Sequence, residues 1–127
     1  MADGAAIGVL APNLFVRAAV DAAVLAAGAR PIAINASEKP RSSGIKVVIL
    51  DLEALGERTA EIVAAFSAAR VTVLAFAPHV AAELLRTARA GGAIALPRQA
   101  FLARLPEVLA IATRPGRSGH PGPVEDE

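Results

Sequence analysis

The sequence contains five short runs of apolar residues with almost no polar side chain inside them. A strand with one solvated face alternates apolar and polar residues, whereas a strand buried on both faces is apolar throughout. The runs are AAIGVLA (5–11), PIAIN (31–35), KVVIL (46–50), VTVLAFA (71–77) and AIAL (93–96). Helical or loop-forming segments separate them. This pattern predicts one α/β domain with a doubly wound parallel sheet of five strands that is covered by helices on both faces.

The segments between the runs predict where the helices lie. Apolar residues recur at helical spacing, and glycines stand where two of these helices would end. Residues 36–44 carry proline, serine and glycine and predict a loop where a second helix would otherwise stand. The predicted helices cover residues 13–30, ending near Gly28, residues 56–70, residues 78–92, closed by Gly91 and Gly92, and residues 98–113, where Pro106 is expected to interrupt the helix and start a fresh turn.

Composition excludes several classes of protein. The net charge is only +1 and aromatic residues make up 3%, so neither charge capture nor base stacking favours nucleic acid as a partner. There is no cysteine, which excludes disulfides and thiolate chemistry. No signal peptide or membrane-spanning run is recognisable, so we expect a cytoplasmic protein without a membrane partner. We expect the domain to cover residues 1–114 and the tail of residues 115–127, rich in proline and glycine, to be disordered.

The ends of the strands are where function is expected. In doubly wound sheets, ligands and chemistry lie at the carboxyl ends of the strands. The residues that follow the five runs are Pro12 and Asn13, Asn35, Asp51, Ala77 to His79, and Leu96 to Arg98. No glycine-rich dinucleotide motif and no P-loop is present.

The segments VVILDLEA (47–54) and ARAGGAIALPRQAFLARLPEVL (88–109) resemble the receiver domains of bacterial two-component response regulators. The resemblance covers residues 5–113. It implies a flavodoxin-like fold with strand order 2-1-3-4-5, and it makes Asp51 equivalent to the aspartate that is phosphorylated in that family. It also implies an acidic pair that holds Mg²⁺, a hydroxyl group and a lysine. Here Pro12 and Asn13, Ala77 or Pro78, and Leu96 stand in those places.

These departures predict a degenerate, stand-alone pseudo-receiver. Transfer of a phosphoryl group to a carboxylate needs a metal ion and a cation to neutralise the developing charge. Asp51 and the Asn13 amide make a poor Mg²⁺ site, so no metal or other cofactor is expected. Asp51 is then expected to accept hydrogen bonds from nearby backbone amides or to cap the next helix. We expect a protein-interaction module of bacterial signal transduction, and not an enzyme.

Two alternatives remain open. In the first, Asp51 is phosphorylated in an atypical but working receiver, with His79 or Arg98 supplying positive charge. In the second, the strand ends form a crevice for a small ligand, lined by Asn13, Asn35, Asp51 and His79.

The protein partner, or a second copy of the chain, is expected to bind where the resemblance places a common receiver interface. This surface consists of the fourth helix, the fifth strand and the fifth helix, with the candidate contact residues Arg86, Arg89, Arg98, Phe101 and Arg104. The last helix carries more apolar residues than one core-facing stripe requires. Either part of it faces a partner, or Phe101, Leu105, Val108 and Leu109 pack on the sheet and Leu102 is an isolated exposed residue.

Overall fold

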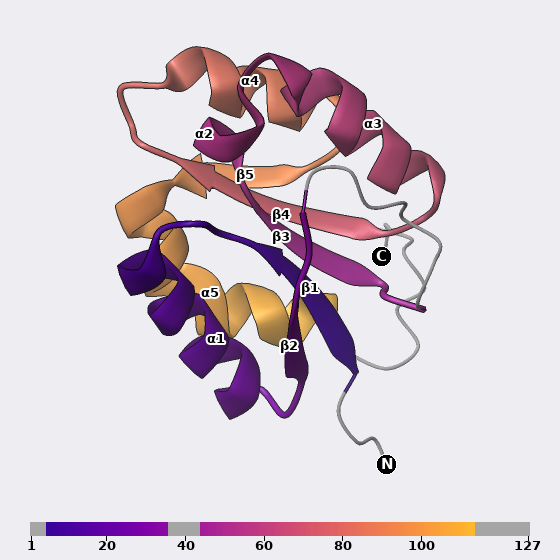
Figure 1. Ribbon diagram of the computed structural model, residues 1–127, viewed down its shortest axis with the longest axis vertical. Helices are drawn as coiled ribbons and strands as arrows, with labels where there is room; N and C mark the ends of the chain where they lie inside the picture. The colour runs from indigo at the N-terminus through magenta and orange to yellow at the C-terminus, as the bar shows by residue number, and fades with distance from the viewer. Residues whose placement is uncertain (1–4, 36–43, 114–127) are drawn as a thin grey trace, which may run out of the picture.

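A computed structural model describes residues 5–35 and 44–113, which form an α/β domain around one parallel sheet (Figure 1). The strand order is β2-β1-β3-β4-β5, and every neighbouring pair is parallel. This is the flavodoxin-like order that the resemblance implied, and the expectation is confirmed. The strands are β1 (Ala6–Leu10), β2 (Arg30–Ala33), β3 (Val47–Asp51), β4 (Thr72–Ala77) and β5 (Ile94–Pro97).

The helices lie on both faces of the sheet, as Figure 1 shows. One face is covered by α1 and α5, and the opposite face by α2, α3 and α4. No helix of the described residues is long and apolar enough to cross a bilayer. The helices are α1 (Leu14–Ala26), α2 (Leu52–Leu55), α3 (Thr59–Ala68), α4 (Ala82–Ala90) and α5 (Arg98–Ala112), and a 3-10 turn η1 (Gly56–Arg58) joins α2 to α3.

Each face of the sheet has its own apolar core. All five residues of β3 are buried, because this strand lies in the middle of the sheet with helices above and below it. On the face of α1 and α5, the rings of Phe76 and Phe101 pack with centroids 5.1 Å apart. Phe101, Leu105, Val108 and Leu109 are all buried against the sheet, as the packing interpretation expected, but Leu102 is half-buried and packs against the same core instead of being an isolated exposed residue.

Two local expectations are wrong. The helix expected from about Gly56 begins instead directly after β3, as α2, and continues through η1 into α3. Pro106 does not start a new helix, because α5 runs through it without a break. Proline removes one N–H donor from the helix, but the buried Leu105 and Leu109 on either side hold both halves of α5 against the sheet.

On the face of the sheet that α2, α3 and α4 cover, the side chains of Ile34 and Ile45 pack near β1. A Cβ atom on Gly8 would lie only 3.2 Å from Ile34 Cδ1, so Ile34 packs directly over the bare backbone of Gly8. Ile45 also packs against this core. The predicted loop at 36–44, apart from Gly44, and the predicted tail at 115–127 lie outside the described residues.

Candidate functional site

Asp51 is the last residue of β3 and caps the helix that follows. Its Oδ1 accepts a hydrogen bond from the backbone N–H of Glu53 at 3.0 Å. Only 6% of its surface is exposed. A carboxylate oxygen that satisfies the free amide at the start of a helix is an ordinary N-cap. Asp51, which the resemblance makes the phosphoacceptor, therefore has a structural role as the N-cap of α2.

Burial raises the pKa of Asp51 above its ordinary value of 3.8. The backbone N–H of Glu53 lowers the pKa, because its hydrogen bond stabilises the charged form of Asp51. The negative carboxylate of Glu53 raises the pKa, and the positive charge of Arg98 lowers it. Because the pKa is raised on balance, the desolvation of the carboxyl group outweighs the donors and the cation.

Arg98 reaches the surroundings of Asp51 from the start of α5. It lies one helical turn before Phe101, which packs on Phe76, and Phe76 is the residue beside Asp51 in the register of β3 and β4. Residues three apart share one face of a helix. Arg98 and Asp51 form no ion pair within 4.0 Å, so the guanidinium acts on the carboxyl group across a longer distance.

The other two candidates for this site have different places. The Oδ1 atom of Asn13 caps α1 by accepting hydrogen bonds from Phe15 N at 2.9 Å and Val16 N at 3.1 Å. His79 is exposed in the connection between β4 and α4. In the described part of the chain, neither side chain forms a hydrogen bond or ion pair with Asp51. The structure thus brings the charge of Arg98 to Asp51, and does not bring Asn13 or His79 into contact with it.

The residues at these strand ends do not fit a Mg²⁺ ion. Mg²⁺ prefers oxygen ligands and is usually held by one or two carboxylates. Here the Asp51 carboxylate is buried and accepts a backbone amide, while Pro12 follows β1 and offers no carboxylate. Among residues 5–35 and 44–113, no group of three or more His, Cys, Asp or Glu side chains could hold a metal.

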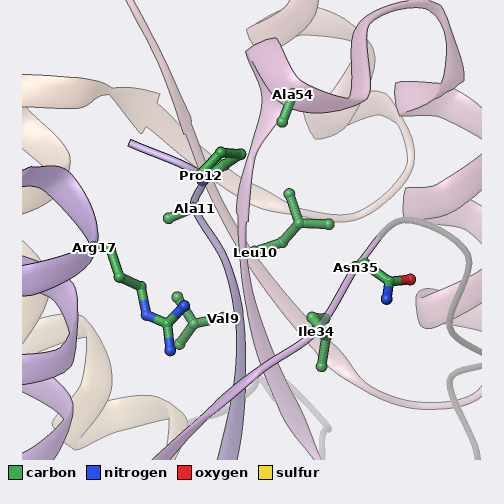
Figure 2. Close-up of a pocket in the computed structure, with 8 residues that line it drawn as sticks. All are labelled: Val9, Leu10, Ala11, Pro12, Arg17, Ile34, Asn35 and Ala54. Carbon is green, nitrogen blue, oxygen red and sulfur yellow. The ribbon is translucent and has the colours of Figure 1, made fainter. Parts of the chain in front are cut away.

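A pocket of about 380 Å³ opens at the end of β1 (Figure 2). Asn35 lines it, but Asn13, Asp51 and His79 do not, so it is not the crevice expected from the sequence. Arg17, Ile34 and Ala54 line it and were not among the candidates. The sequence could have indicated Arg17, because Arg17 and Asp21 are four residues apart on a helix and this spacing predicts an ion pair that orders the arginine side chain.

The expected interface of α4, β5 and α5 is only partly exposed. Phe101 has no exposed surface and belongs to the core, so its assignment as a contact residue is wrong. Arg86 and Arg104 are exposed and pair with Glu83 and Glu107 on their own helices, at 2.7 Å and 3.3 Å. The Nε atom of Arg89 donates to the carbonyl of Ala95 at 2.9 Å. Ile94, on the edge strand β5, exposes 45% of its surface.

Three large apolar side chains are exposed where the chain leaves β1 and β4. They are Leu14 and Phe15 in the first turn of α1, and Val80 in the connection that precedes α4. Their exposed fractions are 79%, 89% and 81%. Single exposed apolar residues are common, and these lie on two elements that cover opposite faces of the sheet, α1 and the connection before α4.

The comparisons with known proteins define the fold. No protein-family model matches the chain, and no curated protein matches it in sequence. Among solved structures, the signal receiver domain of the response regulator NarL from Mycobacterium tuberculosis is 20% identical, with a TM-score of 0.70 over 89% of this chain and 99% of that one. A CheY-like receiver domain protein from Methanospirillum hungatei is 14% identical, with a TM-score of 0.66 over 90% and 100%. A response regulator from Thermotoga maritima is 17% identical, with a TM-score of 0.60 over 84% and 98%.

These similarities establish the receiver fold for almost the whole length of each neighbour. At such low identity they concern the fold alone, because one fold hosts many functions. The function therefore depends on the residues at the strand ends.

Proposed function

We propose that this chain is a receiver-like protein-interaction module of bacterial signal transduction, and that it is not phosphorylated in the usual Mg²⁺-dependent way. The observation that carries this proposal is the use of Asp51 as a buried helix cap. A phosphoryl group on the other carboxylate oxygen would leave Oδ1 an uncharged, weaker acceptor for the cap, and it would add charge to a desolvated position. No second carboxylate follows β1 to offset that charge with a metal ion.

Exposed apolar side chains support a docking role. Leu14, Phe15 and Val80 lie outside the surface of α4, β5 and α5, whereas Ile94 lies on it. For the partner, or for a second copy of the chain, we propose the surface of α4, β5 and α5. Arg86, Arg89, Ile94 and Arg104 are exposed on it, and Arg98 is half-buried.

The proposal is tested by a titration of amide NMR spectra with Mg²⁺ and then with beryllofluoride, which mimics an acyl phosphate. Asp51→Asn is the matched control, since an asparagine oxygen keeps the cap, and Asp51→Ala is the second control. We expect the wild-type spectrum to remain unchanged at the strand ends and in α5. Shifts there in the wild type alone would show that the phosphorylation switch has survived.

The interface is tested separately by sedimentation. Arg86→Glu and Ile94→Asp change the proposed surface, and Leu25→Asp changes an exposed residue of α1 as the control. A dimer or a partner complex should weaken with the first two variants alone. An equal effect of all three variants would place the interface elsewhere.

The alternative of a working receiver has one observation in its favour, which is the action of Arg98 on Asp51. An arginine fork matches phosphate oxygens well and could replace the missing lysine. This alternative requires Mg²⁺-dependent labelling of the protein by a small phosphodonor. Asp51→Asn should abolish the labelling, and Arg98→Gln should reduce it.

A further inference from the structure

The pocket at the end of β1 exists because its neighbour β2 is short. The last hydrogen bond between the two segments runs from Ile34 N to Val9 O, at 3.0 Å, and β2 itself ends at Ala33. Beyond this bond, no described residue forms a strand beside the free edge of β1. The amide N–H of Ala11 has no hydrogen-bond partner among the described residues, although Ala11 is only 6% exposed. An unpaired backbone donor at a buried position is costly and is usually satisfied by some other group.

Arg17 supplies a second donor to the same pocket. Its Nε atom donates to both carboxylate oxygens of Asp21, at 2.8 Å and 2.9 Å. A guanidinium has five N–H donors, so this ion pair leaves the terminal nitrogens unused. Figure 2 shows the guanidinium lying beside Val9, on the side of β1 from which α1 approaches. The ion pair with Asp21 holds the arginine in a defined orientation at the pocket wall.

The remaining wall of the pocket is apolar. It consists of Val9, Leu10, Pro12, Ile34 and Ala54, and only the Asn35 amide adds another polar side chain. Ligand pockets of a few hundred Å³ typically combine an apolar lining with a small number of polar groups that fix orientation. The Ala11 N–H and the charged Arg17 guanidinium are donors in this lining, and together they suit an anionic head group on an apolar body.

We propose that this pocket binds a small carboxylic acid, with its carboxylate at the Ala11 amide and the Arg17 guanidinium and its apolar body against Ile34 and Ala54. The site is separate from Asp51 and does not depend on the proposed signalling function. Asp21 limits the affinity because its negative charge lies near the head group, so the site selects ligands with enough apolar surface to compensate.

The first experiment compares two probes of equal shape and different charge. Hexanoate and its neutral amide, hexanamide, are titrated into the full ¹⁵N-labelled chain, and amide shifts are followed by NMR. We expect saturable shifts with hexanoate at Ala11, Arg17, Ile34 and Ala54, and much weaker ones with hexanamide. Equal affinity for both probes, or shifts centred on other residues, would overturn the proposal.

Three variants then test the residues. Arg17→Gln should weaken hexanoate binding by about 10-fold, the loss expected for one charge-assisted hydrogen bond. Ala54→Leu fills the pocket from an exposed position and should abolish binding without disturbing the core. Arg104→Gln is the matched control, because Arg104 is likewise paired with a carboxylate on its own helix. Unchanged binding in Arg17→Gln, or loss of binding in Arg104→Gln, would contradict the proposed site.

Discussion

Arg89 on α4 donates a hydrogen bond from Nε to the main-chain carbonyl of Ala95 on β5, over 2.9 Å. Ala95 pairs in register with Ala75 of β4. In a parallel pair of strands, only one residue of each register pair uses its N–H and C=O to bond the other strand, and the N–H and C=O of its partner point away from that strand. Arg89 therefore covers a carbonyl on the free edge of the sheet. Two prolines lie at positions whose backbone N atom faces away from the sheet, Pro97 on β5 and Pro31 on the other edge strand, β2. Neither has an N–H that could bond another strand. Each edge strand thus has at least one position that cannot donate a hydrogen bond to another chain.

The first prediction concerns this contact. Arg89→Gln should lower the free energy of unfolding by about 1 kcal/mol, because the Ala95 carbonyl loses its partner at a half-buried position. Urea denaturation measures the change. Arg86→Gln is the control, since Arg86 is largely exposed and only pairs with Glu83 on its own helix. If both variants lose equal stability, the edge contact has no special role.

The second prediction concerns the ends of three helices. After α1, α3 and α4 the backbone turns into the left-handed region, at Gly28 (φ 83°), Arg70 (φ 65°) and Gly92 (φ 102°). The same hydrogen bond follows each turn, and after α3 it runs from Val71 N to Phe66 O at 2.9 Å. Arginine is strained in this conformation and glycine is not. Arg70→Gly should therefore stabilise the protein by about 1 kcal/mol in thermal or urea unfolding, and Arg70→Val should destabilise it.

These helix ends also show what the sequence could and could not predict. Gly28 and Gly92 predicted two of the helix ends. The end of α3 at Arg70 could not be predicted in this way, because arginine does not favour the left-handed conformation that the local hydrogen bonds impose on it. The five strands were predicted to within two residues, since burial on both faces leaves uninterrupted apolar runs.

The site was less predictable than the fold. The position of Asp51 and its role as a cap follow from local sequence, because the acceptor and the helix it caps are adjacent in the chain. The pocket beside Arg17 depends on where β2 ends relative to β1. That position follows from how the two strands pair in the folded sheet, and the local sequence does not reveal it. Phe101 was misassigned because the side of a helix that faces the sheet is decided by tertiary packing.

The third prediction is the pH dependence that Asp51 causes. Its pKa is raised in the folded state, so the folded protein binds more protons than the unfolded one at pH values just above 3.8. Stability then falls as the pH rises from the unfolded pKa through the folded pKa. Asp51→Asn keeps the cap and removes the titration. We expect the two proteins to be similar in stability at low pH, and Asp51→Asn to be the more stable at neutral pH.

Urea unfolding of both proteins at several pH values measures this difference. All other ionisable groups are shared, so their contributions cancel in the comparison. A wild type that gains stability over Asp51→Asn as the pH rises would mean that the hydrogen bond from Glu53 outweighs burial.

The last prediction separates the charge of Arg98 from its packing. Its guanidinium favours the ionised form of Asp51, so Arg98→Gln should move the pKa of Asp51 still higher. The ¹³Cγ resonance of Asp51, followed through an NMR pH titration, reports that pKa directly. Arg104→Gln changes an arginine further along the same helix and should leave the titration unchanged. An unchanged midpoint in Arg98→Gln would show that Arg98 does not act on the carboxyl group, and would remove the one observation that favours a working phosphorylation site.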